Sequence, residues 1–173
     1  AETYISSLNL GAGQFCTNPG IAFVVKSPDT DQFLTELRDA IIKSTPQTML
    51  SESVAKNYKS NKEAMIRDFN LVVEAQASAN SGNNMGAPVL TTVPAQKFID
   101  NPNLSEEVFG PFALMVIADN RKQLLDLIDS LPGQLTATII AESAELVEYK
   151  EAVDKLINKA GRIIFNGMPT GVE

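Results

Sequence analysis

The sequence predicts an α/β domain with three layers (α/β/α), in which a mostly parallel sheet lies between helices. Short apolar runs alternate along the chain with segments whose apolar residues recur at helical spacing. One run, residues 114–118, is apolar throughout, which is typical of a strand buried on both faces. A helix between two such strands normally forms a right-handed crossover, which makes the strands parallel. With 173 residues, the chain is long enough for one domain of this kind.

In the first half of the chain, apolar spacing and helix caps predict three helices and two strands. Residues 4–10 have the pattern of the last turns of a helix. A short strand over residues 22–26 leads through a capping turn to a helix over residues 30–43. Ser51 is a suitable N-cap for a second amphipathic helix, and the apolar run at residues 71–74 favours a strand.

In the second half, residues 78–87 are rich in Ser, Asn and Gly and predict a flexible turn. Apolar residues at helical spacing predict a helix over residues 124–131. The same spacing predicts one long helix over residues 146–157, which Gly161 ends from the C-cap position. The strands of this half are expected at residues 88–93, 114–118, 136–141 and 162–166.

Composition and charge exclude several classes of protein. Hydrophobic residues make up 44% of the chain, a share that indicates a globular domain rather than a disordered segment. The net charge of −7 argues against nucleic acid or a membrane surface as a partner, because both bind clustered Lys and Arg. The sequence has no apolar run of membrane-spanning length and no signal-peptide pattern. With one cysteine and no histidine, a reducing cytoplasm is expected and a zinc site is disfavoured.

The one cysteine, Cys16, lies in a loop that also contains Gly11, Gly13, Pro19 and Gly20. Structural cysteines are usually buried among apolar side chains, whereas this loop allows tight turns and a close approach of another molecule. A cysteine nucleophile needs access and oxyanion donors, and Gly11 and Gly13 would leave room for a substrate. On composition alone, a packed thiol in a tight turn is the simpler interpretation. The lack of histidine disfavours a stand-alone cysteine hydrolase.

Three strings, in this order along the chain, resemble signatures of the aldehyde dehydrogenase superfamily. The string G-Q-F-C-T at residues 13–17 is similar to its active-site cysteine motif. About 90 residues later, E-E-V-F-G-P at residues 106–111 resembles the motif E-[IV]-F-G-P. Near the end, G-R-I-I-F-N-G at residues 161–167 resembles the segment G-x-[IV]-x-x-N. The three matches cover the whole chain, which is therefore similar to the catalytic domain of that superfamily.

The resemblance implies covalent catalysis by Cys16. In this family a cysteine thiolate attacks the aldehyde carbon, hydride passes from the thiohemiacetal to NAD or NADP, and water hydrolyses the thioester. Cys16 is implied to be that nucleophile, and its own backbone N–H is implied to be half of the oxyanion hole. Phe15 and Thr17 are implied to face the aldehyde tunnel, with ordinary loop packing as the alternative for both.

Four further residues have implied roles. Glu107 matches the glutamate that holds the nicotinamide ribose hydroxyls, a sound role for a carboxylate, which accepts strong hydrogen bonds. Its alternative is a solvated charge in a turn. Phe109 is implied to pack beside the nicotinamide ring, and a core aromatic is the alternative. Asn166 and Met168 lie where the family's substrate-pocket loop begins.

Other parts of the family's machinery are expected outside these residues. The general-base glutamate, the asparagine that completes the oxyanion hole and the nucleotide-binding domain all precede the cysteine in the family. Residues 1–173 are therefore expected to form a single catalytic domain, truncated at both ends and inactive alone. Its expected partners are the aldehyde substrate and the nucleotide-binding domain of the same full-length chain, which is expected to be a homo-oligomer.

The exact residues around two of the motifs narrow the resemblance to one branch of the superfamily and leave more than one substrate open. Residues 14–20 and 165–172 resemble the branch that contains 2,5-dioxovalerate (α-ketoglutaric semialdehyde) dehydrogenases and some bacterial fatty-aldehyde dehydrogenases. A dioxovalerate substrate carries a carboxylate, which favours Arg or Lys in the tunnel, and neither flanks Cys16. A fatty aldehyde therefore remains the second substrate, and a non-enzymatic structural or assembly domain of the same fold remains the second function.

Overall fold

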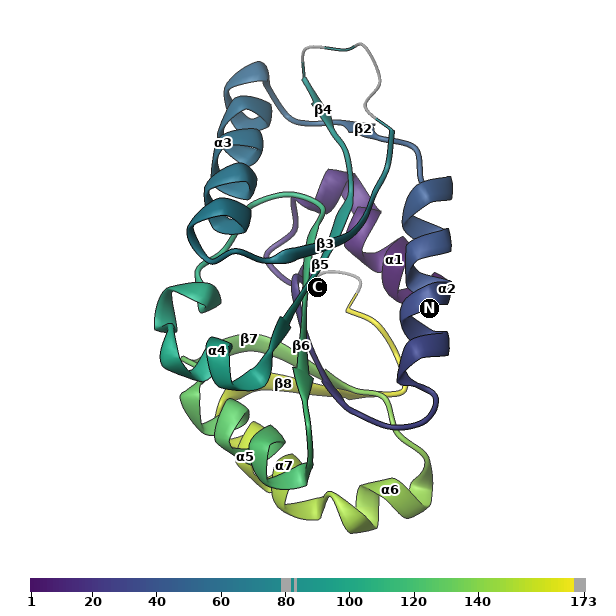
Figure 1. The fold of residues 1–173 in the computed structure, drawn as a ribbon, viewed down its shortest axis with the longest axis vertical. Coiled ribbons are helices and arrows are strands. Elements are labelled where there is room, and N and C mark those ends of the chain that lie inside the picture. Colours follow the sequence, from purple (N-terminus) through teal and green to yellow (C-terminus); the bar gives the residue numbers. More distant parts are fainter. Residues whose placement is uncertain (79–81, 83, 170–173) are drawn as a thin grey trace.

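The computed structural model describes residues 1–78, 82 and 84–169, and its centre is a four-stranded sheet (Figure 1). The strand order is β1 (Ile21–Val25), β6 (Phe112–Ala118), β5 (Val89–Pro94) and β3 (Val72–Gln76). β1 pairs with β6 and β6 with β5 in parallel, whereas β3 pairs with β5 antiparallel. The predicted mostly parallel sheet is therefore confirmed. β3 is the exception because no helix lies between it and β5 to carry the chain back across the sheet.

Helices cover both faces of this sheet, as the three-layer prediction requires. α1 (Glu2–Asn9) and α2 (Thr30–Lys43) pack on one face. α3 (Glu52–Asp68), α4 (Ala95–Asp100) and α5 (Arg121–Ser130) pack on the other, and Figure 1 shows the two groups on opposite sides of the strands. Each face has its own cluster of buried apolar side chains.

β6 lies in the middle of this core, and its residues alternate between the two clusters. All of its residues except Ile117 are buried, which confirms the strand predicted from the run at residues 114–118. The α3–α5 side receives Phe112, Leu114, Val116 and Ala118. The α1–α2 side receives Ala113 and Met115. Alternation follows from the two-residue period of a strand, and both faces are apolar because helices cover both.

The amphipathic helices begin and end near the predicted residues. α2 runs over Thr30–Lys43, as predicted, and buries Leu34, Leu37 and Ile41. α3 begins after Ser51, whose Oγ accepts a hydrogen bond from the Val54 N–H at 3.3 Å. This N-cap satisfies one of the backbone donors that the first helical turn leaves free.

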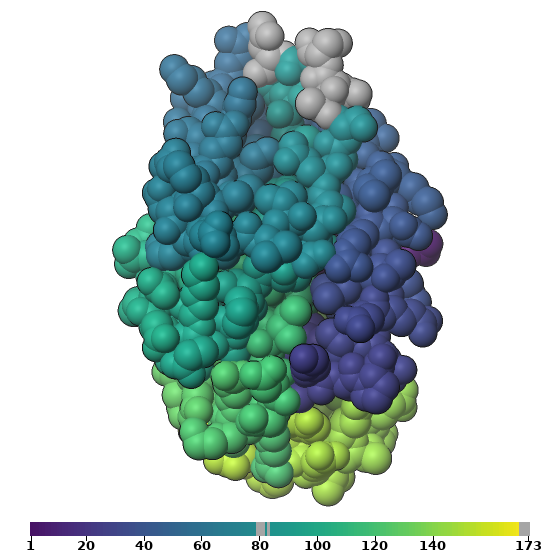
Figure 2. Space-filling view, viewed as in Figure 1, coloured from purple at the N-terminus to yellow at the C-terminus, as the bar shows by residue number. Residues whose placement is uncertain are grey.

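The C-terminal part adds a separate pair of parallel strands at one end of the molecule. β7 (Gln134–Ile139) pairs with β8 (Ala160–Phe165), and α6 (Ser143–Glu148) and α7 (Lys150–Ile157) connect them. In the space-filling view this part, green to yellow, forms the lower end of the molecule (Figure 2). Within the described residues, no helix is both long and apolar enough to cross a membrane.

The single long helix predicted over residues 146–157 is wrong, because the backbone leaves the helical region at Tyr149 (φ −96°, ψ 22°). α6 buries none of its residues, whereas α7 packs on α5. The Lys155 ammonium contacts the Asp129 carboxylate of α5 at 2.7 Å. The direction of α7 is therefore set by tertiary contacts that α6 lacks.

Two smaller expectations also need correction. Gly161 does not end the helix; it lies in β8, and Asn158 is the C-cap of α7. The predicted flexible turn at residues 78–87 lies partly outside the described residues. Within it, β4 (Met85–Gly86) pairs antiparallel with β2 (Gln47–Thr48).

Candidate active site

The predicted nucleophile, Cys16, is a free and exposed cysteine in the loop that connects α1 to β1. We refer to residues 14–20 as the Cys16 loop. The backbone N–H of Asn18 donates to the Phe15 carbonyl at 3.1 Å, which closes a turn around the cysteine. The Asn18 amide donates to the Leu8 carbonyl at 2.9 Å, and the Tyr4 hydroxyl donates to the Pro19 carbonyl at 2.9 Å. The Tyr4 hydroxyl and the Leu8 carbonyl, both on α1, therefore hold the loop against this helix.

A short 3-10 turn, η1 (Leu10–Gly13), leads into the Cys16 loop with three successive left-handed residues. Gly11, Ala12 and Gly13 have φ values of 54°, 56° and 69°. Such a conformation is costly for alanine, so surrounding contacts must impose it. The Ala12 N–H donates to the Gln47 side chain at 3.1 Å, which is one of these contacts.

Gly13 brings this turn into backbone contact with the second motif, whose residues 107–111 we call the 107–111 segment. A Cβ atom built on Gly13 would lie 2.4 Å from the carbonyl carbon of Gly110 and 2.5 Å from the Pro111 nitrogen. A Cβ atom on Gly11 would lie 2.5 Å from the Phe15 ring. The expectation that Gly13 leaves room for a substrate is therefore wrong, because the protein's own backbone fills that space. A side chain at Gly11 would instead meet the Phe15 ring.

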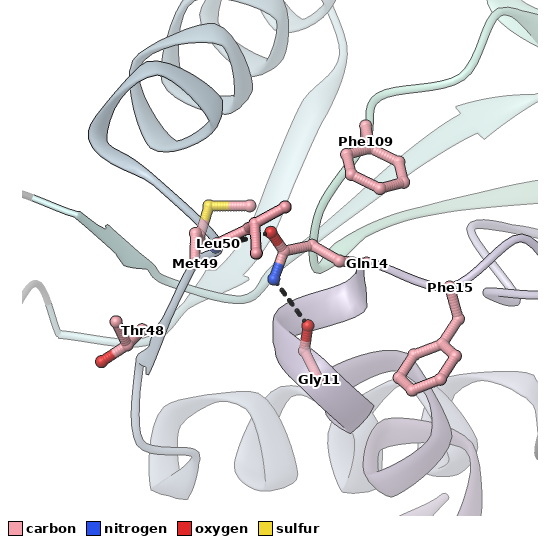
Figure 3. Close-up of a pocket in the computed structure, with 7 residues that line it drawn as sticks. All are labelled: Gly11, Gln14, Phe15, Thr48, Met49, Leu50 and Phe109. Carbon is pink, nitrogen blue, oxygen red and sulfur yellow. Dashed lines mark hydrogen bonds between the residues drawn. The ribbon is translucent and has the colours of Figure 1, made fainter.

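A groove of about 400 Å³ lies beside the Cys16 loop (Figure 3). Phe15 and Phe109, from segments far apart in the sequence, both border it, and 38% and 40% of their surfaces are exposed. The other lining residues are Gly11, Gln14, Thr48, Met49 and Leu50. The groove therefore lies where the cysteine motif, the 107–111 segment and the β2–α3 connection meet.

Gln14 fixes two walls of this groove, a role that the sequence did not reveal. Its Nε2 donates to the Gly11 carbonyl at 2.8 Å, and its Oε1 accepts from the Leu50 N–H at 2.9 Å (Figure 3). The only sequence signal was its place in the cysteine motif. No sequence signal pointed to its partner Leu50, because the partner atom is a backbone N–H, which almost every residue has.

The other predicted residues lie in different surroundings. Glu107 is exposed and lies two residues before Phe109 on the same segment. Thr17 is buried, with 5% of its surface exposed, so its side chain points into the domain. Met168 is half-buried and packs against the cluster on the α1–α2 side. Within the part of the chain that the structure describes, the lining of the groove does not include Cys16, Glu107, Thr17 or Met168.

Asn166 joins the ends of β7 and β8. Its φ is 49°, and its backbone N–H donates to the Ile139 carbonyl at 2.9 Å. Its side-chain oxygen accepts from the Ala141 N–H, and its side-chain nitrogen donates to the Ala141 carbonyl, both at 3.0 Å. This clamp uses the whole amide, so the structure gives Asn166 a structural part in addition to its predicted place at the substrate pocket.

Sequence comparison connects the chain with known dehydrogenases. The model of the aldehyde dehydrogenase family matches residues 1–173. An Acinetobacter baylyi protein named alpha-ketoglutaric semialdehyde dehydrogenase is 39% identical over 174 residues, which cover all of this chain and 33% of that protein. Alpha-ketoglutaric semialdehyde dehydrogenase 2 of Azospirillum brasilense is 34% identical over 178 residues, with the same coverage. The chain therefore spans about a third of the length of these curated relatives.

Solved structures agree on the fold. Proline utilization A from Bdellovibrio bacteriovorus matches with a TM-score of 0.81 at 19% identity, over 98% of this chain and 18% of that one. An aldehyde dehydrogenase from Bacillus cereus matches with a TM-score of 0.77 at 17% identity, over 99% of this chain and 35% of that one. The three-layer α/β architecture is thus that of aldehyde dehydrogenase structures. Because the family's model matches every residue and the relatives align over the whole chain, the chain belongs to the aldehyde dehydrogenase family.

Proposed function

We propose that residues 1–173 form the cysteine-bearing catalytic domain of an NAD- or NADP-dependent enzyme that oxidises an aldehyde to a carboxylate. One observation carries the proposal: the exposed Cys16 follows a turn whose Gly13 packs on Gly110, in the middle of the second family motif. This contact supports the proposal, because it joins the loop of the proposed nucleophile to the segment of the proposed cofactor residues. Rigid placement of reacting groups is a large part of enzymatic rate enhancement.

In the proposed chemistry, the deprotonated Sγ of Cys16 attacks the aldehyde carbon. The new C–S bond forms as the carbonyl π electrons move to oxygen, and the backbone N–H of Cys16 stabilises that oxyanion. When bound beside Glu107 and Phe109, NAD(P)+ would supply the two-electron oxidising power that converting the Cys16 thiohemiacetal to a thioester requires. Cys16 then holds the acyl group as a thioester, and water cleaves it to the carboxylate and the free thiol.

The residues present fit the cofactor. Glu107 is an exposed carboxylate that can accept hydrogen bonds from two ribose hydroxyls. Phe109, which is exposed at the edge of the groove, offers a ring against which a flat heteroaromatic ring can pack. The groove's volume of about 400 Å³ is also in the usual range for small-molecule sites. The remaining cofactor contacts and the general base are proposed to lie in the part of the enzyme that these residues do not span.

The proposed substrate is an acid-bearing aldehyde of the α-ketoglutaric semialdehyde type, which both curated relatives have in their names. Phe15, which borders the groove, is proposed to contact the substrate. Thr17, Asn166 and Met168, which do not line the groove, are proposed to support the residues of the substrate pocket. By family resemblance, the complete enzyme is proposed to be a cytoplasmic homo-oligomer.

The test uses the full natural chain that contains these residues, with the variant Cys16→Ser. Turnover of α-ketoglutaric semialdehyde with NAD+ or NADP+ should fall at least about a thousandfold, because no other group replaces the nucleophile. Unfolding free energy should change by no more than about 0.5 kcal/mol, because Cys16 is exposed. Ser60→Ala, on the exposed side of α3, is the control and should keep full activity. A Cys16→Ser enzyme with more than a tenth of the turnover would refute the proposal.

Two further measurements separate the alternatives. A long-chain fatty aldehyde that is turned over faster than the semialdehyde would reassign the substrate but keep the chemistry. A full chain that oxidises neither aldehyde would favour the structural or assembly function. Residues 1–173 alone should show no turnover, and robust turnover by this fragment would refute the proposal that the base and the cofactor domain lie elsewhere.

A further inference from the structure

We propose that Tyr58 is a positioning residue that sets the distance between the 107–111 segment and the Cys16 loop. The inference rests on the proposed function, because it assigns Tyr58 the task of aligning the cofactor-contacting residues with the nucleophile. Tyr58 lies on α3, far in sequence from both motifs, and only 3% of its surface is exposed.

The hydroxyl of Tyr58 lies between the segments that lead into two central strands. It is 2.8 Å from the Ala87 carbonyl and 3.1 Å from the Pro111 carbonyl. A phenol has one proton to donate, so the two carbonyls share it. The Pro111 carbonyl also accepts from the Val89 N–H at 3.0 Å. Tyr58 thus ties the start of β5 to the last residue of the 107–111 segment.

The ring of Tyr58 packs directly against Gly110 in the same segment. A Cβ atom on Gly110 would lie 2.4 Å from the ring Cδ2, and Gly110 has a φ of 149°. The backbone of Gly110 is in turn the surface on which Gly13 packs. The Tyr58 ring therefore packs on the Gly110 backbone, which packs in turn on the Gly13 backbone. Only the backbone at Gly110 separates Tyr58 from the turn before Cys16.

Lys62, one turn further along α3, also contacts the ring of Tyr58. Its ammonium lies 5.4 Å from the ring centroid, a cation–π distance, although only 8% of Lys62 is exposed. Leucine at position 58 would fill the core without burying a hydroxyl. The buried hydroxyl and the cation above the ring instead fix the orientation of Tyr58, and with it the Pro111 carbonyl.

The experiment uses three variants of the full natural chain. Tyr58→Phe keeps the ring and removes the hydroxyl, and Tyr58→Leu removes the ring. Thr91→Val is the matched control, because the buried Thr91 hydroxyl donates to the Ala113 carbonyl of β6 at 2.9 Å and not to a residue of either motif. For each variant, thermal stability, kcat, KM for NAD(P)+ and the rate of Cys16 alkylation by iodoacetamide are measured.

Tyr58→Phe should raise the cofactor KM about threefold to tenfold, as loss of one hydrogen bond predicts, and leave Cys16 alkylation within about twofold. Tyr58→Leu should raise the same KM and also change the alkylation rate more than about threefold, because the ring that packs on Gly110 is gone. Thr91→Val should lower stability about as much as Tyr58→Phe and leave KM within about twofold.

Equal effects of Tyr58→Phe and Thr91→Val on the cofactor KM would overturn the inference, since Tyr58 would then act only through stability. An unchanged KM in Tyr58→Phe would overturn it as well. If Tyr58→Leu does not fold, Tyr58→Phe against Thr91→Val decides alone. Failure of the proposed function is distinguishable, because it appears as turnover that survives Cys16→Ser.

Discussion

Gly13 and Gly110 meet backbone to backbone, so closely that a Cβ atom on Gly13 would lie 2.4 Å from the carbonyl carbon of Gly110. The contact joins the turn before Cys16 to the segment with Glu107 and Phe109. Neither backbone can accept a side chain at this point without moving. The two family motifs are therefore one packed unit, and substitutions at the contact should act on both.

Gly13→Ala should destabilise the domain by about 2–5 kcal/mol. The range combines the cost of a left-handed alanine, for which the φ of 69° is unfavourable, with the cost of overpacking against backbone that cannot rotate away. Urea unfolding measures the change. Gly133→Ala is the control, because the nearest atom to its added Cβ would be 3.9 Å away. Equal stability of the two variants would contradict the close contact.

The regular elements could be predicted where local pattern and packing agree. The extent of α2 followed from apolar residues at helical spacing, and the same residues are buried in the structure. The break at Tyr149 could not be predicted, because the apolar spacing continues through it and only α7 is held on α5. The antiparallel pairing of β3 was hidden for a related reason, since it depends on a connection that lacks a helix.

The candidate site divides in the same way. The two sequence motifs predicted Cys16 and Glu107 as site residues, but a motif does not predict which atoms are in contact. The role of Gly13 became clear only when the fold placed Gly110 against it. Tyr58 appeared in the sequence as one more apolar position of α3, because its two carbonyl partners belong to segments that approach through the tertiary structure.

Asn166 should be more sensitive to alanine than to glycine. Both changes remove the two side-chain hydrogen bonds to Ala141, worth about 0.5–1.5 kcal/mol each. Alanine also bears the cost of the φ of 49°, so Asn166→Ala should be less stable than Asn166→Gly by about 0.5–1 kcal/mol. Chemical denaturation of both variants measures the order. Asn158→Ala, which loses one bond at an ordinary φ of −85°, is the control. A glycine variant less stable than the alanine variant would contradict the strained backbone.

Lys62→Met should preserve or raise stability at neutral pH, with any loss below about 1 kcal/mol, because replacing a buried charge by an apolar side chain is often neutral or favourable. Burial lowers the pKa of Lys62, so the folded state binds its proton less tightly than the unfolded state does. Wild-type stability should therefore rise as pH increases from neutral through the lowered pKa toward 10.5. The variant should lose this rise.

Urea unfolding between pH 7 and about pH 10 measures the difference in slope between wild type and Lys62→Met. Lys56→Met is the control, because Lys56 is exposed on the same helix. If Lys62→Met loses more than about 2 kcal/mol, the cation above the Tyr58 ring stabilises the fold more than an exposed cation–π contact normally does.

Tyr4→Phe and Tyr58→Phe should each make the domain more tolerant of alkali. Burial raises the pKa of both phenols well above the ordinary value of 10.0, while the same residues ionise normally in the unfolded chain. Above pH 10 the unfolded state thus gives up protons that the folded state keeps, and stability falls as pH rises. Each tyrosine contributes a slope of about 1.4 kcal/mol per pH unit, so each Phe variant should remove that much of the slope.

Denaturation at pH 9.5 to 11.5 measures the slope of the unfolding free energy, and phenolate absorbance reports when the tyrosines ionise. Single variants with the full wild-type slope would mean that these hydroxyls reach solvent before the domain unfolds.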